Sequence, residues 1–148
     1  MSEVSSTALH ATLVARWIEG RRRGVLIRGP SGAGKSTLAL RCLGAGFQLV
    51  ADDRVLVFIS GGRLYGKAPP PLAGLLEVRG VGVACAAPPG GLSEIDMVLD
   101  LVDVAERLPE PEIVEIHGIG LTRQRLPLDG ADLPLRISVA LAALQRRL

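Results

Sequence analysis

One short segment limits what this 148-residue chain can fold into more than any other. Residues 29–36 read GPSGAGKS and match the pattern GxxxxGK[ST] in full. Its glycines let the backbone curve around phosphate oxygens, its N–H groups form an anion-binding nest, and the helix behind it adds a positive dipole end. Val25–Ile27 before the loop reads as a strand and Lys35–Gly44 after it as a helix, which is the context that this motif requires. The sequence therefore predicts a nucleotide-binding P-loop.

The residues of this loop have separate expected roles. Lys35 is one of only two lysines in the chain, and it can reach the β- and γ-phosphates. The hydroxyl of Ser36 can ligate Mg²⁺. ATP with Mg²⁺ is therefore the expected ligand, although contacts to phosphates leave the preferred base undetermined. The candidate nucleotide-binding residues are Gly29, Pro30, Ser31, Gly32, Ala33, Gly34, Lys35, Ser36 and Thr37.

Two adjacent carboxylates, Asp52 and Asp53, follow the apolar run 49–51. Carboxylates at the end of a core strand often face the ligand of an α/β site, and a P-loop protein needs one Asp near its Mg²⁺. Because neighbouring residues of a strand point to opposite sides, we expect the two to differ in role. One can serve the metal while the other faces the acceptor as general base. A plain turn after a strand is the alternative interpretation of this pair.

Strand patterns dominate the rest of the chain. We predict strands over 9–15, 24–27, 47–51, 55–59, 63–67 and 95–102. Segment 75–83 reads as strand or loop, and 112–128 as one or two strands. Asp132 is placed to cap a final helix, with Pro134 in its first turn and apolar residues at helical spacing as far as Leu148. The pattern predicts a strand-rich α/β domain, not an alternating βαβα series.

Two of these segments carry charges whose placement is a specific prediction. Arg21–Arg23 fall in an expected turn over 19–23, where they could contact phosphate or an acidic partner. A solvated hairpin tip is the favoured interpretation. In 95–102, Asp96 and Asp100 alternate with apolar residues, which predicts a strand with one face in solvent.

Composition places the chain among globular proteins, with 48% apolar and 22% charged residues. A net charge of +2 gives no indication of a nucleic-acid partner, and no apolar run is long enough to span a membrane. The polar segment 1–7 lacks a secretory signal and is expected to be flexible. Cys42 and Cys85 are expected to be reduced, buried thiols. We predict one cytoplasmic domain over residues 1–148.

Three segments together resemble the catalytic domain of the HPr kinase/phosphorylase family. They are 24–40 with the P-loop, 49–55 with the two carboxylates, and 74–82, which reads GLLEVRGVG and looks like the family signature. His10 fits as well, because the family places a histidine on the strand before the P-loop strand. The resemblance covers about residues 8–148 and is closest to the short form known among alphaproteobacteria. It implies a strand-rich P-loop kinase domain with a core like that of PEP carboxykinase.

The resemblance also implies an activity. Members phosphorylate a serine of the small carrier protein HPr, and they run a reverse reaction in which phosphate attacks phosphoserine and pyrophosphate leaves. Asp52 would take the serine proton and return it in reverse, while Ser36, Asp53 and Glu77 would lie around Mg²⁺. Arg79 would steady a phosphate or an active loop. Members assemble as hexamers, which implies a homo-oligomer here.

For His10 the sequence leaves two interpretations open. It lies between Leu9 and Ala11 in an apolar run, which is typical of a structural histidine with its hydrogen bonds satisfied. The resemblance favours a catalytic role instead.

The departures from the family pattern include two at or near the expected phosphate contacts. Thr37 stands where members often have an acidic residue. Segment 127–132 lacks the arginine of the family's Pro-x-x-Gly-Arg, so phosphorolysis is less secure than kinase activity. The candidates to replace that arginine are Arg123, Arg125 and Arg136.

Two other functions remain as alternatives. One is a P-loop kinase of a small molecule, against which the 75–82 signature argues. The other is a nucleotide-binding sensor with little catalysis, against which the intact P-loop and Asp pair argue. The lack of an NKxD-like guanine motif argues against a switch GTPase.

Overall fold

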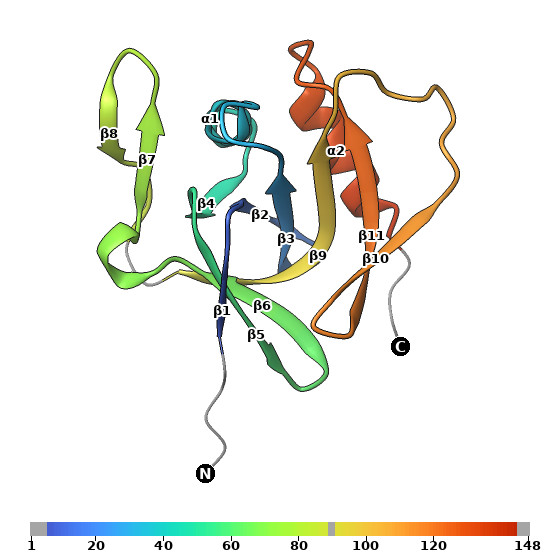
Figure 1. Cartoon of the computed structure of the whole chain (residues 1–148), viewed down its shortest axis with the longest axis horizontal. Helices are drawn as coiled ribbons and strands as arrows, with labels where there is room; N and C mark the ends of the chain where they lie inside the picture. The colour runs from blue at the N-terminus through green and yellow to red at the C-terminus, as the bar shows by residue number, and fades with distance from the viewer. Residues whose placement is uncertain (1–5, 89–90, 145–148) are drawn as a thin grey trace.

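The computed structural model describes residues 6–88 and 91–144, and strands make up most of them (Figure 1). Residues 1–5 of the segment expected to be flexible, and Leu148 of the expected last helix, lie outside the described residues. In chain order the elements are β1 (Thr7–Leu9), β2 (Thr12–Ile18), β3 (Arg21–Arg28), α1 (Lys35–Leu43), β4 (Gln48–Ala51), β5 (Val55–Ser60), β6 (Arg63–Lys67), η1 (Pro70–Leu72), β7 (Leu75–Val78), β8 (Gly82–Cys85), β9 (Leu92–Leu101), β10 (Glu112–Ile116), β11 (Ile119–Leu126) and α2 (Leu133–Ala142).

The hairpin of β2 and β3 carries the strand that leads into the P-loop. Ile18 pairs with Arg21 across a two-residue turn, in which Glu19 and Gly20 have φ values of 52° and 84°. Positive φ at both positions gives a turn whose twist suits the flanking strands. The predicted turn over 19–23 is therefore too long, and the three arginines belong to β3.

The prediction of a solvated arginine tip is wrong. Arg21 donates hydrogen bonds of 2.6 Å to both Glu94 and Asp96 on β9. Arg23 is only 5% exposed and lies 3.5 Å from Glu19. Arg21 thus fastens the hairpin to the neighbouring strand β9, whereas Arg23 is buried against the turn of its own hairpin.

β9 is the central strand of the sheet. It runs parallel to β3 on one side, and on the other it pairs first with β6 and then, in parallel, with β11. Met97, Val98 and Leu99 are all fully buried, so both faces of the strand are covered. The predicted half-exposed strand is wrong, because its acidic residues are neutralised by arginines on the neighbouring strands and are not solvated.

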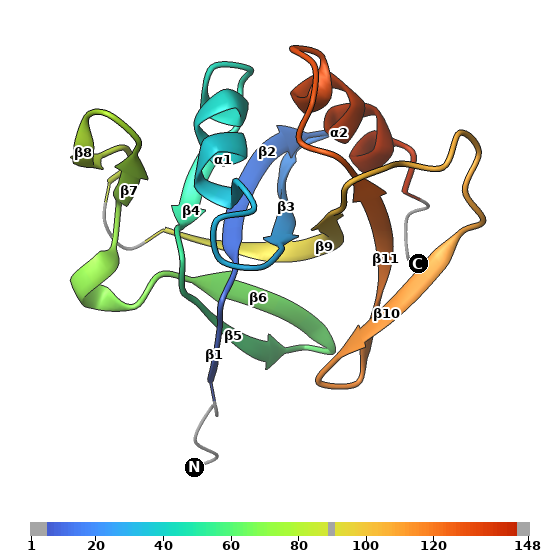
Figure 2. The same ribbon diagram turned by 45° about the horizontal axis from the view of Figure 1, so that its top comes forward.

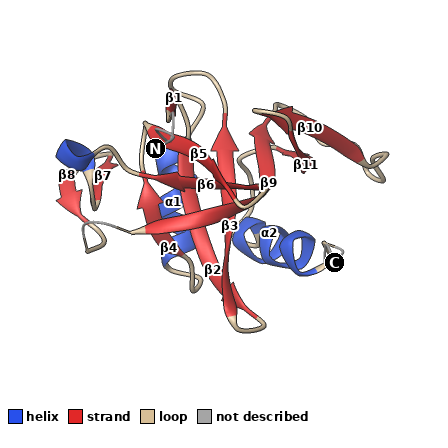
Figure 3. Cartoon of the chain, turned by 90° about the horizontal axis from the view of Figure 1, so that it is seen from below, coloured by secondary structure: helices blue, strands red, loops and turns tan. Residues whose placement is uncertain are grey.

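The main sheet has the order β1-β5-β6-β9-β3-β2-β4, with β11 also on β9, and it divides the interior into two cores. On one face, α1 and α2 pack against β3 and β9 residues such as Ile27 and Leu99. On the other face, β5 and β6 cover Leu13, Leu26 and Val98. Figure 2 shows these layers from top to bottom, and in Figure 3 α1 is partly hidden behind the strands.

The segment 75–83, read as strand or loop, is part of a hairpin. β7 and β8 form a separate two-stranded sheet that stands beside α1 (Figure 1). Leu76 is fully buried in the core with α1, whereas Val81 and Val83 are 77% and 69% exposed. The hairpin is therefore anchored at its base and exposed at its tip.

α2 confirms the predicted helical stripe in part, since Leu133, Ile137 and Leu141 are fully buried. The predicted cap is wrong: Asp132 precedes the helix, but its side chain caps no backbone N–H and instead accepts a 3.0 Å bond from Arg136. Neither α1 nor α2, within the part of the chain that the structure describes, is a candidate for a membrane-spanning helix.

Candidate active site

The P-loop follows β3 at the carboxyl edge of the sheet, where its helix α1 begins (Figure 2). Gly34, the residue before α1, has φ 102°, and a Cβ there would collide with Leu128 from the loop before α2. The positive φ favours glycine here, and any larger residue would also require the end of the Leu128 side chain to move. The crest of the loop, Pro30–Gly32, is exposed, as is Thr37 on the first turn of α1. The loop is thus open to a ligand above and held from the side by the C-terminal segment.

Lys35 is placed for a phosphate. Its ammonium donates to the carbonyl oxygens of Gly29 at 2.8 Å and Pro30 at 3.3 Å, which folds the side chain back over the loop. Among the described residues it has no carboxylate partner. The positive charge over the loop is therefore not neutralised by the protein.

Asp52 lies at the centre of the site. Its Oδ1 accepts a 2.7 Å hydrogen bond from Ser36 and a 3.0 Å bond from Thr12, and its Oδ2 accepts a 3.2 Å bond from the backbone N–H of Glu77. The residue is only 6% exposed. This one carboxylate therefore connects four elements: the P-loop helix α1, β2, the end of β4 and β7.

Asp53 is placed quite differently from its neighbour. It is exposed and has φ 65°, in the left-handed region that an aspartate tolerates better than most residues. The two carboxylates differ because the strand ends at Ala51 and the chain turns, and not because a strand continues through both. It is Asp52, and not Asp53, that touches the Ser36 hydroxyl.

The signature segment enters the site through its backbone. The N–H of Glu77 reaches Asp52, while the Glu77 side chain is exposed. Arg79 lies two residues further, in the exposed turn between β7 and β8. Glu77 is thus next to the Ser36–Asp52 pair, and Arg79 is at the tip of the hairpin.

His10 is exposed and lies in the bend between β1 and β2, outside both strands. This exposure does not fit the interpretation of His10 as a structural histidine within an apolar run. Leu9 pairs with Val55 and Leu13 with Ala51, so residues 10–12 run beside the turn that holds both carboxylates. The histidine is brought to the edge of the site by strand register.

Sequence reasoning missed Asp100, which lies one residue before the end of β9 and pairs with the last residue of the P-loop strand β3. Arg28 donates to its two oxygens at 2.8 and 2.9 Å, and Arg123 of β11 donates to one of them as well. Burial alone would raise the pKa of Asp100, but hydrogen bonds and charge from both arginines outweigh burial and hold that pKa below its usual range. The signal was present: an apolar run ends in an aspartate here, as it does at Asp52.

The three arginines considered as replacements for the absent family arginine are all engaged. Arg123 pairs with Asp100 and Glu112, and Arg125 with Glu112. Arg136 pairs with Asp132 at 3.0 Å. Arg123 is linked to the P-loop strand through Asp100, whereas Arg136 belongs to α2.

The donor set around Ser36 suits a hard cation, because it consists of a hydroxyl and carboxylate oxygens. Residues 6–88 and 91–144 contain no group of three or more His, Cys, Asp or Glu side chains arranged to hold a metal. A nucleotide-borne Mg²⁺ is held largely by phosphate and water oxygens, so one or two carboxylates suffice. Ser36 and Asp52 fit that requirement, with Asp53 next to Asp52 in the chain and Glu77 brought close by its backbone hydrogen bond to Asp52.

Comparisons with known proteins agree with this arrangement. The model of the family described as HPr Serine kinase C-terminal domain matches residues 3–111. The HPr kinase/phosphorylase of Streptococcus thermophilus (strain ATCC BAA-491 / LMD-9) is 37% identical over 135 residues, covering 82% of this chain and 42% of that protein. That of Clostridium botulinum (strain Eklund 17B / Type B) is 42% identical over 89 residues, covering 60% and 28%. The chain thus spans less than half the length of these curated relatives.

A solved structure extends the likeness to the fold. The Hpr(Ser) kinase/phosphatase from Coxiella burnetii superposes with a TM-score of 0.73 at 26% identity, covering 90% of this chain and 87% of that one. The strand-rich α/β fold expected from the sequence is thereby confirmed.

Proposed function

The chain belongs to the HPr serine kinase C-terminal domain family, and on that premise we propose that it transfers the γ-phosphoryl group of ATP to a serine of the carrier protein HPr. The contact between Ser36 and Asp52 carries this proposal, because it joins the phosphate-binding loop to a buried carboxylate. A P-loop alone would support nucleotide binding only. A carboxylate within reach of the transferred group supports chemistry on an acceptor hydroxyl.

In the forward reaction the serine oxygen attacks the γ-phosphorus as the bond to ADP breaks. Asp52 takes the hydroxyl proton, since a serine hydroxyl is a weak nucleophile without a base. Lys35 and the P-loop amides meet the negative charge of the phosphates. Bound Mg²⁺ supplies further charge neutralisation, and Ser36, Asp53 and Glu77 are the residues proposed around it. His10 and Arg79 are proposed at the rim, facing the acceptor and the transferred phosphate.

The same groups serve a phosphorolysis reaction. An oxygen of inorganic phosphate attacks the phosphorus of phosphoserine, the phosphorus–serine bond breaks, and pyrophosphate forms. Asp52 then returns its proton to the leaving serine oxygen. Arg123 is the arginine we propose for the incoming phosphate, because Asp100 holds it beside Arg28, which directly precedes the P-loop.

Assembly and location follow as further parts of the proposal. Leu135 and Val139 on α2 are 65% and 62% exposed, which supports a homo-oligomer, with a hexamer expected from the family resemblance. HPr as acceptor and ATP as donor support a cytoplasmic location. Neither nucleic acid nor membrane has a part in the proposed reaction.

The proposal is tested with purified protein, radiolabelled ATP, Mg²⁺ and HPr from the same organism. Label on a serine of HPr is the expected result, and excess phosphate should then release labelled pyrophosphate. Lys35→Ala is the matched control, because it removes the phosphate contact while leaving Asp52 in place. Bound ATP without labelled HPr would reject the proposal in favour of a sensor or of a small-molecule acceptor.

A further inference from the structure

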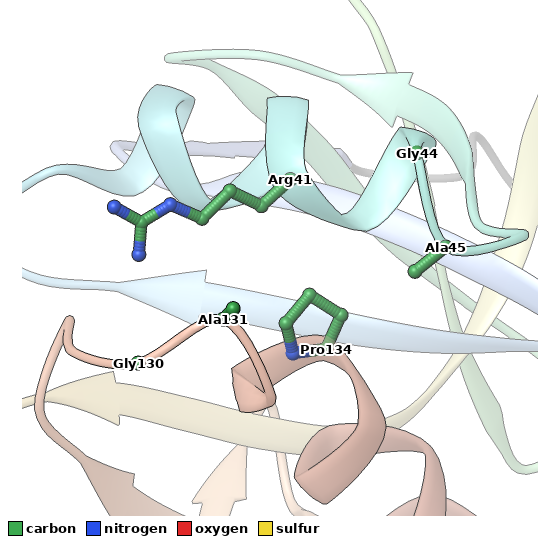
Figure 4. A pocket seen from close by; sticks show the side chains of 6 residues that line it. All are labelled: Arg41, Gly44, Ala45, Gly130, Ala131 and Pro134. Atoms are coloured by element: carbon green, nitrogen blue, oxygen red, sulfur yellow. The ribbon is translucent and has the colours of Figure 1, made fainter.

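A groove separates the C-terminal end of α1 from the loop before α2 (Figure 4). Its volume is about 550 Å³, which is within the range of small-molecule sites. It is lined by Arg41, Gly44, Ala45, Gly130, Ala131 and Pro134. None of these residues belongs to the P-loop, and none has a part in the chemistry above.

The groove continues from the phosphate site. Leu128 packs against Gly34, so the loop before α2 starts beside the P-loop and then runs along α1 to Gly130 and Ala131. Arg41 is six residues beyond Lys35, which corresponds to about 9 Å along the helix axis. A nucleotide whose phosphates lie on Lys35 and whose ribose follows α1 therefore brings its base to this groove.

The chemistry of the lining suits a planar heterocycle. Five of the six residues are Gly, Ala or Pro, so their side chains offer flat apolar surfaces and no polar groups. Arg41 is exposed, and within the described part of the chain its side chain forms no ion pair or hydrogen bond, in contrast to that of Arg136 across the groove. In Figure 4 its side chain runs back along α1 toward the helix N-terminus. A guanidinium in this position can stack on the face of a base.

The far end of the groove is held in place by Arg16. Its Nη1 donates to the carbonyl oxygen of Ala45 at 3.2 Å and to the hydroxyl of Ser138 at 3.0 Å. The end of α1 and the body of α2 are thereby joined at a fixed separation. A site that is formed before binding costs little ordering free energy when the ligand enters.

We propose that this groove binds the base of the nucleotide, with Arg41 stacked on the face of the ring. The inference rests on the proposed function only in requiring that the P-loop bind a nucleoside triphosphate. It requires no acceptor protein, so binding alone can test it.

The test compares ATP with inorganic tripolyphosphate, which has the same phosphate chain and no base. Each is titrated calorimetrically, with Mg²⁺, into the wild type and Arg41→Ala. We expect Arg41→Ala to weaken ATP binding about tenfold and to leave tripolyphosphate binding unchanged. Arg41→Lys keeps the charge and loses the planar group that stacks, so it too should weaken the binding of ATP and not that of tripolyphosphate. Arg107→Ala removes an exposed arginine outside the groove and should change the affinity for neither ligand.

Ala131→Leu provides an independent variant, because the larger side chain fills the groove from the opposite wall. It should weaken ATP binding and leave tripolyphosphate binding unchanged. Unchanged ATP affinity in both Arg41→Ala and Ala131→Leu would overturn the proposal. Equal losses for the two ligands would also overturn it, since Arg41 would then contact phosphate. A wild type that binds ATP and never phosphorylates HPr would reject the proposed function while leaving this result interpretable.

Discussion

The hydroxyl of Ser36 and the Oδ1 of Asp52 are 2.7 Å apart, so a hydrogen bond joins the start of α1 to the residue that follows β4. Ser36 ends the phosphate-binding motif, and Asp52 is the proposed base. Any metal bound at the Ser36 hydroxyl would therefore also be close to Asp52. The division of roles between Asp52 and Asp53 is the most direct question that the structure raises.

Asp52→Asn should reduce the rate of HPr phosphorylation by at least about a hundredfold, because an amide cannot take the serine proton. The amide oxygen can still accept the bonds from Ser36 and Thr12, and only the 3.2 Å bond from the Glu77 N–H is lost, so ATP affinity should change little. Steady-state kinetics with HPr, beside calorimetric ATP titration, separate the two effects. Full activity in this variant would remove the assignment of Asp52 as general base.

Asp53→Asn should raise the Mg²⁺ concentration needed for half-maximal activity, by about tenfold if Asp53 orients the ion or its waters. Asparagine tolerates the left-handed backbone at φ 65°, so the substitution adds no strain. The measurement is activity against Mg²⁺ concentration at saturating ATP. An unaltered Mg²⁺ dependence would transfer the metal role to Asp52.

Asp100→Asn should lower the free energy of unfolding by about 2 kcal/mol, because Arg28 loses its carboxylate partner and Arg123 keeps only Glu112. Urea unfolding measures the loss. Asp129→Asn is the control, since its exposed carboxylate lies 4.0 Å from Arg136 and should contribute little.

Acid should reduce the difference in the free energy of unfolding between the wild type and Asp100→Asn. The pKa of Asp100 is depressed in the folded state, so its contribution is complete above the unfolded value of about 3.9 and is lost as pH falls through the folded pKa. Unfolding curves at pH 7 and below pH 4 give the comparison. A difference independent of pH would show that the ion pairs are not its source.

Cys42 should be inert to thiol reagents in the native protein. Burial raises the pKa of its thiol to about 12, so almost no thiolate is present at neutral pH, and the residue is fully buried. Cys85 is exposed, which contradicts the expectation that both thiols are buried. A chromogenic disulfide reagent should therefore titrate one thiol rapidly and the second only on unfolding. Two rapidly reacting thiols would contradict this prediction.

Local patterns predicted the elements that short-range interactions determine. The P-loop helix, the β5–β6 hairpin and the buried stripe of α2 each depend on residues that are close in the chain, and the first two appear within a residue of their predicted bounds. The strand-rich character was also predictable, because strand patterns outnumber helical ones.

Contacts between distant residues account for what the sequence did not reveal. Thr12 reaches Asp52 across 40 residues, and no local signal marks it as part of the site. The alternation of Asp96 and Asp100 indicated solvent, but arginines from β3 and β11 occupy that face instead. A periodic pattern cannot distinguish a carboxylate facing water from one facing a guanidinium.

The packing of Leu128 against Gly34 shows how much of the chain has to fold to form the ligand site. Every motif residue of the site lies before residue 112, within the family match, yet the wall beside Gly34 is Leu128. Leu121, Leu133, Ile137 and Leu141 from the same late segment complete the two cores. The region that the family model matches is therefore shorter than the region that must fold together to hold the ligand site rigid.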